Sequence, residues 1–173
     1  MRSINIVFIG INPSPHTSRS GIAFSHPTNT FWPLLEETGI IDASPSIEFK
    51  LNPPFEIFNL ITRVTSSSAD LSEKEMINAV PKLIEQLQRI QPKYVCFVGI
   101  CIFKAFLKYL RQYKSRNIIL GLQSKRYLGM TVHVMPSTSQ RGVTYTRKRK
   151  KELLMTLATA LKEDGNLFEK ITK

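Results

Sequence analysis

The sequence has 173 residues, 42 % of them hydrophobic, which is typical of one globular domain spanning residues 1–173. No stretch reaches the roughly 20 consecutive apolar residues that a membrane span requires, so a membrane protein is not expected. The net charge of +11 is concentrated, because residues 101–151 contain 13 Lys or Arg and no Asp or Glu. This segment predicts a polyanionic partner, nucleic acid before an anionic membrane, and a merely soluble basic surface is the alternative.

Strands and helices are predicted to alternate along the chain. Apolar runs predict strands at 4–11, 94–98 and 132–135, the first of them buried on both faces, and a short strand or turn at 57–61. Capping signals and apolar periodicity predict helices at 29–38, from about 72 to 91, at 100–113 and at 147–163. Pro81 predicts a kink or a late start in the second helix, and residues 12–28 and 40–56 are expected to be irregular. This order predicts a three-layer α/β fold with a central, mostly parallel four-stranded sheet flanked by helices.

Cysteine and histidine usage argues against metal sites and disulfides. Cys96 and Cys101 lie across an expected strand-to-helix boundary, so we expect buried, unreactive thiols in a reducing compartment. Two cysteines alone cannot hold an iron–sulfur cluster or a structural zinc ion, and the three histidines lack metal-ligand spacing. The N-terminal apolar run is short and is followed by Pro13, which does not fit a signal peptide.

Three polar loops, at 12–28, 99–101 and 136–146, follow predicted strands. Ligands of open parallel sheets bind beyond the carboxyl ends of the strands, so these loops should meet at one crevice. The sequence contains no GxGxxG, GxxxxGK[ST] or GxSxG motif. The loops also hold no pair of carboxylates, so glycosidase chemistry with two acids is not supported.

Residues at these loops carry a resemblance to a known family. The segments GINPS (10–14), AFSHPTNTFW (23–32) and MPSTSQR (135–141) occur in order, with NLITRVT (59–65), DLSEKE (70–75) and YVCFVGICIF (94–103) between them. This set resembles the mismatch-specific uracil/thymine-DNA glycosylases of the uracil-DNA glycosylase superfamily over residues 4–163. The resemblance implies a monofunctional DNA N-glycosylase that hydrolyses the N-glycosidic bond of a flipped-out uracil in base excision repair. Its implied partner is double-stranded DNA with a U:G, or else a T:G, mismatch, and no metal or organic cofactor is implied.

By this resemblance, Asn12 positions the water that attacks C1′ of the sugar. An amide can orient water but cannot deprotonate it, and faster uracil glycosylases have Asp there, so slow chemistry is expected. Without the resemblance, Asn12 indicates only a strand-terminal turn before Pro13. No lysine matches the attacking position, so neither a Schiff base nor strand cleavage is expected.

The base pocket implied by the resemblance involves five residues: Ile11, Thr17, Ala23, Phe24 and Asn29. Phe24 would stack on the extruded base, with an ordinary core role as the alternative. The backbone near Ile11 and Phe24 would bond the uracil edge, and Asn29 would face the pocket, cap the next helix, or both. Thr17 and Ala23 would pass C5 of the base, where a threonine crowds a thymine methyl, so uracil should be preferred over thymine.

The last motif supplies the implied DNA contacts: Ser137, Ser139, Gln140 and Arg141. The two serines would grip phosphates, and Arg141 would fill the vacated stack or make a plain phosphate contact. The basic run 147–151 predicts an extended DNA footprint, a nuclear-localisation signal or a solvated helix start. We expect a structural role for His26.

The chain departs from the family at Ser14-Pro15, where Gly-Leu is usual, and at Ile100, where a lysine is usual. Lys104 or Lys125 is a candidate to replace that lysine. These departures leave two alternatives: a glycosylase of the same fold for another base, such as single-stranded uracil, hypoxanthine or ethenocytosine, or a protein that only binds mismatches. We expect a monomer, located in the nucleus of a eukaryote or otherwise in the cytoplasm, and no membrane association.

Overall fold

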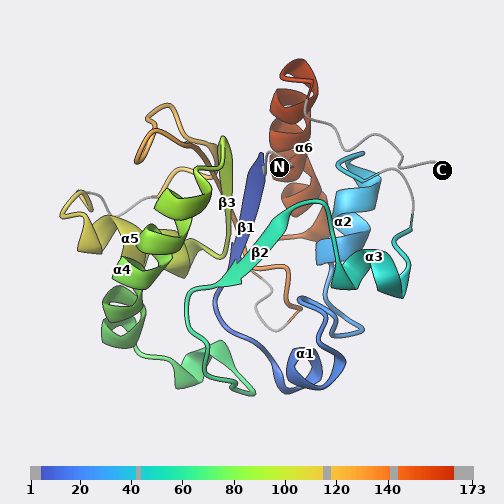
Figure 1. Ribbon diagram of the computed structural model, residues 1–173, viewed down its shortest axis with the longest axis horizontal. Coiled ribbons are helices and arrows are strands. Elements are labelled where there is room, and N and C mark those ends of the chain that lie inside the picture. The colour runs from blue at the N-terminus through green and yellow to red at the C-terminus, as the bar shows by residue number, and fades with distance from the viewer. Residues whose placement is uncertain (1–4, 42–43, 115–117, 141–143, 166–173) are drawn as a thin grey trace.

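A five-stranded sheet forms the centre of the computed structural model, which describes residues 5–41, 44–114, 118–140 and 144–165 (Figure 1). The strand order is β2-β1-β3-β5-β4. The strands are β1 (Ile6–Gly10), β2 (Glu56–Asn59), β3 (Tyr94–Val98), β4 (Gly121–Leu122) and β5 (Thr131–Met135). The first three and β5 pair in parallel, whereas β4 is antiparallel to β5. The carboxyl ends of the four parallel strands therefore meet at one edge of the sheet.

Helices cover both faces of this sheet. The helices are α1 (Pro15–Ser20), α2 (Phe31–Glu37), α3 (Ile47–Leu51), α4 (Glu73–Ile90), α5 (Ile100–Tyr109) and α6 (Arg147–Glu163), with a 3-10 helix, η1 (Ser68–Asp70). One core joins α4 and α5 to the sheet, and a second core joins α2 and α6 to the opposite face. The predicted three-layer α/β fold is confirmed.

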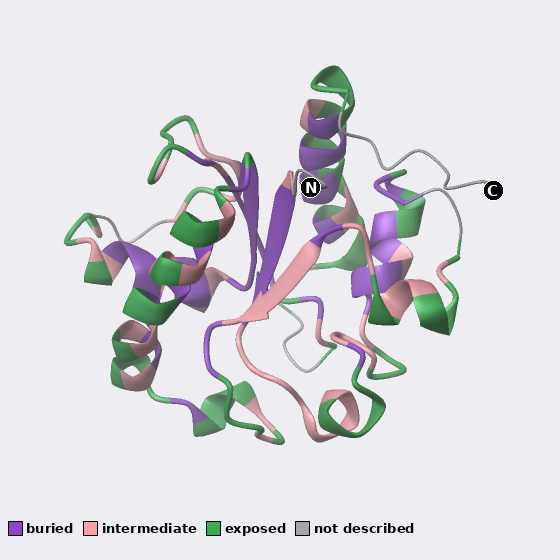
Figure 2. Cartoon of the chain, in the orientation of Figure 1, coloured by how far each residue is buried: buried purple, intermediate pink, exposed green. Residues whose placement is uncertain are grey.

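The first strand shows why the sequence adopts these layers. Val7 and Ile9 lie in the core with α4 and α5, whereas Ile6 and Phe8 lie in the core with α2 and α6. Successive side chains of a strand point to opposite faces, so a strand covered on both faces must be apolar throughout. Figure 2 shows β1 and β3 as buried, while the edge strand β2 is intermediate.

The structure corrects several predicted boundaries. The three predicted strands are present, the segment predicted as a short strand or turn contributes to β2, and the two-residue β4 was not predicted. Helices α1 and α3 occupy segments predicted as irregular, and α5 ends at Tyr109 instead of residue 113. Helix α4 begins at Glu73 and continues through Pro81, so of the two predicted alternatives, a kink or a late start, the late start is excluded. Among the described helices, none is both long enough and apolar enough to cross a membrane.

The two cysteines are free thiols, as predicted. Cys96 is buried, and its sulfur lies 3.5 Å from Nδ1 of the fully buried His133. His133 Nε2 lies 2.8 Å from the Leu153 carbonyl oxygen, which can only accept, so the ring hydrogen is on Nε2. Burial raises the pKa of both cysteine thiols, which keeps them in the unreactive protonated form.

Candidate active site

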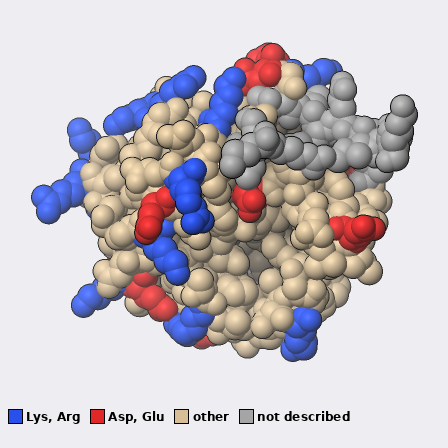
Figure 3. Space-filling model, in the orientation of Figure 1, with Lys and Arg blue, Asp and Glu red and all other residues tan. Residues whose placement is uncertain are grey.

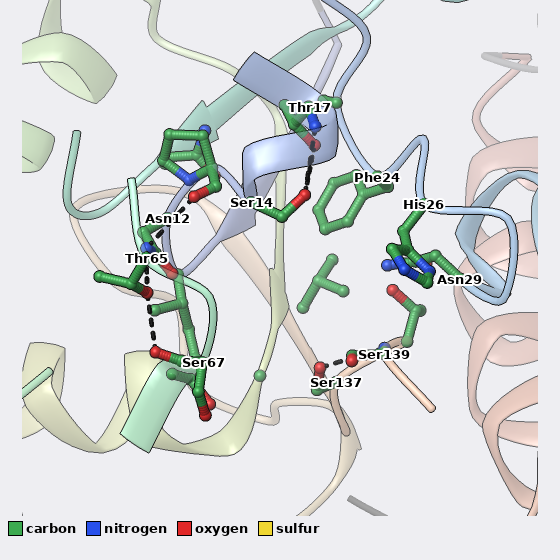
Figure 4. A pocket seen from close by; sticks show the side chains of 18 of the residues that line it. Asn12, Ser14, Thr17, Phe24, His26, Asn29, Thr65, Ser67, Ser137 and Ser139 are labelled. Atoms are coloured by element: carbon green, nitrogen blue, oxygen red, sulfur yellow. Dashed lines mark hydrogen bonds between the residues drawn. The ribbon is translucent and has the colours of Figure 1, made fainter. Parts of the chain in front are cut away.

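A cavity of about 560 Å³ opens at the carboxyl ends of the parallel strands, a size suited to a small ligand. Its wall is built from the segment after β1 with α1, the end of β2, residues 65–68, the start of α5, and the loop after β5. Figure 4 shows Asn12, Thr65 and Ser67 on one side and His26 and Asn29 on the other, with the Phe24 ring between them. The three loops that the sequence assigned to one crevice do meet there.

The amide of Asn12 is held in one orientation. Its Nδ2 donates to the Arg63 carbonyl oxygen and to Thr65 Oγ1, each at 2.8 Å. The carbonyl can only accept, and the Thr65 hydroxyl already donates its hydrogen to the Ser67 carbonyl oxygen at 2.7 Å. Both neighbours therefore require the nitrogen of the amide, and Oδ1 remains as an acceptor without a partner among the described residues.

The backbone that holds Asn12 continues the β1–β2 pairing beyond the sheet. Leu60 donates to the Gly10 carbonyl oxygen, and Thr65 donates to the Pro13 carbonyl oxygen at 3.3 Å. Residues 60–65 thus run beside residues 10–13. The guanidinium of Arg63 bonds both carboxylate oxygens of Glu75 on α4, at 3.1 and 2.9 Å, which ties this segment to the helix. The bonds from Arg63 also hold the pKa of Glu75 below its ordinary value.

Phe24 lies in the cavity in a strained conformation. Its φ of 56° is in the left-handed region, which a bulky residue adopts only when its surroundings enforce it. The ring stacks on Phe31 with centroids 4.1 Å apart. A Cβ at Gly10 would stand 3.0 Å from both Phe24 Cζ and Asn59 Oδ1, so only glycine allows these side chains to approach β1 so closely.

The remaining predicted pocket residues, Ile11, Thr17, Ala23 and Asn29, also line the cavity. The Ile11 carbonyl oxygen is used by Ile61 N–H, so only the rest of that backbone is free for a ligand. Ala23 is held by Trp32, whose indole donates to its carbonyl oxygen at 2.9 Å. Asn29 Oδ1 accepts from the Phe31 N–H at 2.9 Å, but the N-cap of α2 is Thr30, so Asn29, predicted as the cap, supports the helix start from one residue before the observed cap position.

Ser14 and Pro15, which depart from the family pattern, create α1. Ser14 is the N-cap of this helix, its hydroxyl accepts from Thr17 N–H at 3.2 Å, and Pro15 is the first helical residue. Both choices favour a helix start. The departure therefore builds the wall that carries Thr17, and the Ser14 hydroxyl also donates to Thr17 Oγ1 at 3.2 Å.

The loop after β5 brings Ser137 and Ser139 to the cavity. It is anchored through Thr138, whose carbonyl oxygen accepts from the N–H and the hydroxyl of Thr30, each at 3.1 Å. The Ser139 N–H donates to Ser137 Oγ at 3.2 Å. Gln140 is exposed and does not line the cavity. Arg141, predicted to fill the vacated stack, lies outside the described residues.

Several cations of the predicted basic surface have partners within the protein. Lys104 pairs with Glu73 and Lys125 donates to Gln112, and neither of these two candidates for the lysine missing at position 100 lines the cavity. In the run 147–151, Arg147 and Lys151 pair with Glu37, Arg149 pairs with Glu152, and Lys150 is buried. Figure 3 shows basic and acidic side chains mixed over α4 and α5.

Two polar side chains that line the cavity, one asparagine and one threonine, were not predicted from the sequence. Asn59 ends β2 and Thr65 follows it, and both line the cavity. Their polar character at the end of a short predicted strand was the available signal. In the described part of the chain, no group of three or more His, Cys, Asp or Glu is placed to hold a metal ion.

Comparisons with known proteins agree with the cavity described above. A family model of the uracil DNA glycosylase superfamily matches residues 2–160. A relative from Schizosaccharomyces pombe, described as a G/U mismatch-specific uracil DNA glycosylase, is 28 % identical over 96 % of this chain. The chain spans about half of that relative, 52 % of its length. The match to the superfamily model covers nearly all of the chain, and the predicted family is confirmed: the chain belongs to the uracil DNA glycosylase superfamily.

Proposed function

We propose that this protein is a monofunctional DNA glycosylase that removes uracil from U:G mismatches in double-stranded DNA, acting as a single domain and as a monomer. The observation that carries the proposal is the fixed amide of Asn12, whose Nδ2 is bonded to Arg63 and Thr65 and whose Oδ1 is left to accept. Phe24 offers an aromatic face to the same cavity, whose volume suits a small ligand. Family membership and the mismatch-specific relative support the same reaction.

The chemistry follows from the groups that line the cavity. Asn12 Oδ1 accepts a hydrogen bond from a water, which turns a lone pair of that water towards C1′ of the sugar. The C1′–N1 bond breaks with its electron pair moving to the uracil ring, and the water oxygen bonds C1′. The excess proton on this oxygen passes to solvent, and the uracil anion takes up a proton from solvent, so the products are neutral uracil and the abasic sugar. No Asp or Glu lines the cavity in the described part of the chain, so the reaction depends on an oxocarbenium-like sugar and on hydrogen bonds to the departing base.

The flipped base is proposed to stack on Phe24 and to meet the amide of Asn59, which, like the Phe24 ring, lies close to the Cα of Gly10. Thr17, fixed by its bonds to Ser14, would stand beside C5 of the base. A methyl group at C5 would crowd this threonine, which favours uracil over thymine. Ser137 and Ser139 would bond the phosphates next to the flipped nucleotide, with Gln140 and Arg141 reaching towards the opposite strand.

The first test is a single-turnover assay on end-labelled duplexes that contain U:G, U:A or T:G, and on single-stranded uracil DNA. Alkali would reveal the abasic product. We expect release from U:G, with slower or no release of thymine from T:G. The Asn12→Ala variant should lose roughly 100-fold or more in rate, because it removes the group that positions the water.

Asn78→Ala is the matched control, because Asn78 is an exposed asparagine on α4 outside the cavity. Its rate should equal that of the wild type. If the wild type binds mismatched duplexes but releases no base from any substrate, the protein is a mismatch-binding protein and the enzymatic proposal is wrong. Release of hypoxanthine or ethenocytosine faster than uracil would instead assign another base to the same cavity. We further propose that the protein is nuclear if its source is a eukaryote and cytoplasmic otherwise.

A further inference from the structure

Three nitrogen-bearing side chains of the cavity wall have no role in the chemistry proposed above. They are His16 and Arg19 on α1 and His26 on the loop that follows it, and all three line the cavity. Figure 4 shows His26 across the cavity from Asn12. The two imidazole rings meet edge to face with centroids 5.8 Å apart, so the two histidines lie side by side in the cavity wall.

The hydrogen-bonding state of His26 is fixed by its neighbours. The Thr28 N–H donates to His26 Nδ1 at 3.3 Å, and the Thr28 hydroxyl lies 3.0 Å from the same atom. A backbone N–H can only donate, so Nδ1 is the acceptor and the ring hydrogen is on Nε2. His26 Nε2 has no partner among the described residues, which leaves an N–H donor at the cavity wall.

A chain of hydroxyl groups sets His16 in the same way. Ile22 N–H donates to Ser20 Oγ at 3.2 Å, Ser20 Oγ lies 2.8 Å from Ser25 Oγ, and Ser25 Oγ lies 3.0 Å from His16 Nδ1. The Ser20 hydroxyl has a second acceptor, the Thr17 carbonyl oxygen, but that contact is long at 3.5 Å against 2.8 Å to Ser25. We therefore take Ser20 to donate to Ser25, and Ser25 to donate to His16 Nδ1. The ring hydrogen of His16 then lies on Nε2, giving a second donor beside the first.

Arg19 supplies a positive charge in the same cavity wall. It stands three residues after His16 and so on the same side of α1. Arg19 is the only Lys, Arg, Asp or Glu that lines the cavity in the described part of the chain, and it has no polar partner there. The wall therefore offers one positive charge and two N–H donors with no carboxylate to oppose an anion.

We propose that Arg19, His16 and His26 form a phosphate-binding subsite for a phosphodiester of the DNA strand that carries the flipped nucleotide. The inference rests on the proposed function, because it takes the anion to be DNA that already occupies the cavity. A phosphodiester accepts hydrogen bonds at two oxygens and carries one negative charge, which matches two N–H donors and a guanidinium. Position 100, where a lysine was expected, is Ile in this chain, and Arg19 of the subsite provides a cation at the same cavity.

The test is binding of the full chain to duplexes with an uncleavable tetrahydrofuran abasic analogue opposite guanine, measured over a range of salt concentrations. Arg19→Gln should bind roughly 5- to 10-fold more weakly at ~0.1 M salt and lower the slope of log K against log salt by about 0.9. His16→Ala and His26→Ala should weaken binding without changing that slope, and His16→Gln, which keeps a terminal N–H donor, should recover part of the loss. Lys82→Gln on α4 removes the same charge from an exposed position outside the cavity and is the matched control.

Replacing single phosphates by uncharged methylphosphonates identifies the partner. The effect of Arg19→Gln should disappear on the one duplex whose contacted phosphate is already neutral, and persist on the others. An effect equal on all duplexes, or equal to that of Lys82→Gln, overturns the subsite. Single-turnover release of uracil by the wild type is measured alongside. If the wild type releases uracil but no single methylphosphonate cancels the effect of Arg19→Gln, the subsite alone is overturned. If one methylphosphonate cancels that effect but no uracil is released, the glycosylase proposal alone is overturned.

Discussion

The buried His133 should make the stability of this fold fall between about pH 6.5 and pH 4. Burial lowers the pKa of His133 from 6.5 to about 4, against the smaller opposing effect of its bond to Leu153. The unfolded chain therefore binds a proton at higher pH than the folded chain does. Stability from this residue is fully present above pH 6.5, is lost as the pH falls through 6.5, and stops changing near pH 4.

The size of the effect follows from the two pKa values. A shift from 6.5 to about 4 corresponds to about 3 kcal/mol once both states are protonated, and about 2 kcal/mol of that is lost by about pH 5. His133→Gln removes the titrating group while its amide can still donate to the Leu153 carbonyl oxygen. The cost of that substitution itself does not depend on pH, and the other two histidines are common to both proteins.

The measurement is urea unfolding of the wild type and His133→Gln at about pH 7.5 and about pH 5, followed by tryptophan fluorescence. The wild type should lose about 2 kcal/mol more than the variant between these conditions. Equal losses in the two proteins would refute the reasoning, because they would mean that His133 binds its proton equally well in the folded and unfolded states.

Three further substitutions test the cavity and its support. Gly10→Ala places a methyl group 3.0 Å from Phe24 Cζ, so the free energy of unfolding should fall by about 1–3 kcal/mol, seen as a lower melting temperature. The same variant should bind abasic-analogue DNA more weakly. Thr65→Val keeps the shape but removes the acceptor for Asn12, so single-turnover release of uracil should slow by about 10-fold or more while DNA binding is retained; an unchanged rate would contradict the role of the fixed amide. Glu37→Gln removes the partner of two α6 cations at a partly exposed site, so urea unfolding should show a loss of only ~0.5–1 kcal/mol that disappears at high salt.

Buried parallel strands were the part of the fold that sequence reasoning predicted best. Strands such as β1 and β3 are covered on both faces, and their apolar runs are hard to mistake once flanked by turn residues. Helix α1 was missed because its Pro, His, Thr, Ser and Arg side chains form no apolar stripe, so only the capping by Ser14 marks it. The strand β4 has only two residues, Gly121 and Leu122, too few for any pattern to develop.

The site was predictable where a residue's position in the chain places it at a strand end. Asn12 follows β1, and Ser137 follows β5, so both reach the cavity whatever the loops do in detail. The orientation of the Asn12 amide was beyond sequence reasoning, because it depends on backbone pairing between residues 10–13 and 60–65. Arg19 was not singled out for the same reason, since its approach to the cavity requires α1 to form.

The fixed amide of Asn12 limits which mutational steps are open to this chain. An aspartate there would be a stronger base, but it would bring an oxygen against the Arg63 carbonyl oxygen, where an acceptor meets an acceptor. The hydroxyl of Thr65 offers no relief, because its hydrogen is already donated to Ser67. Replacement by aspartate alone should therefore be unfavourable, and a faster enzyme requires residues 63–67 to change together with residue 12. Because the Asn12 Nδ2 bonds both Arg63 and Thr65, substitutions at residue 12 and in residues 63–67 should occur together in evolution.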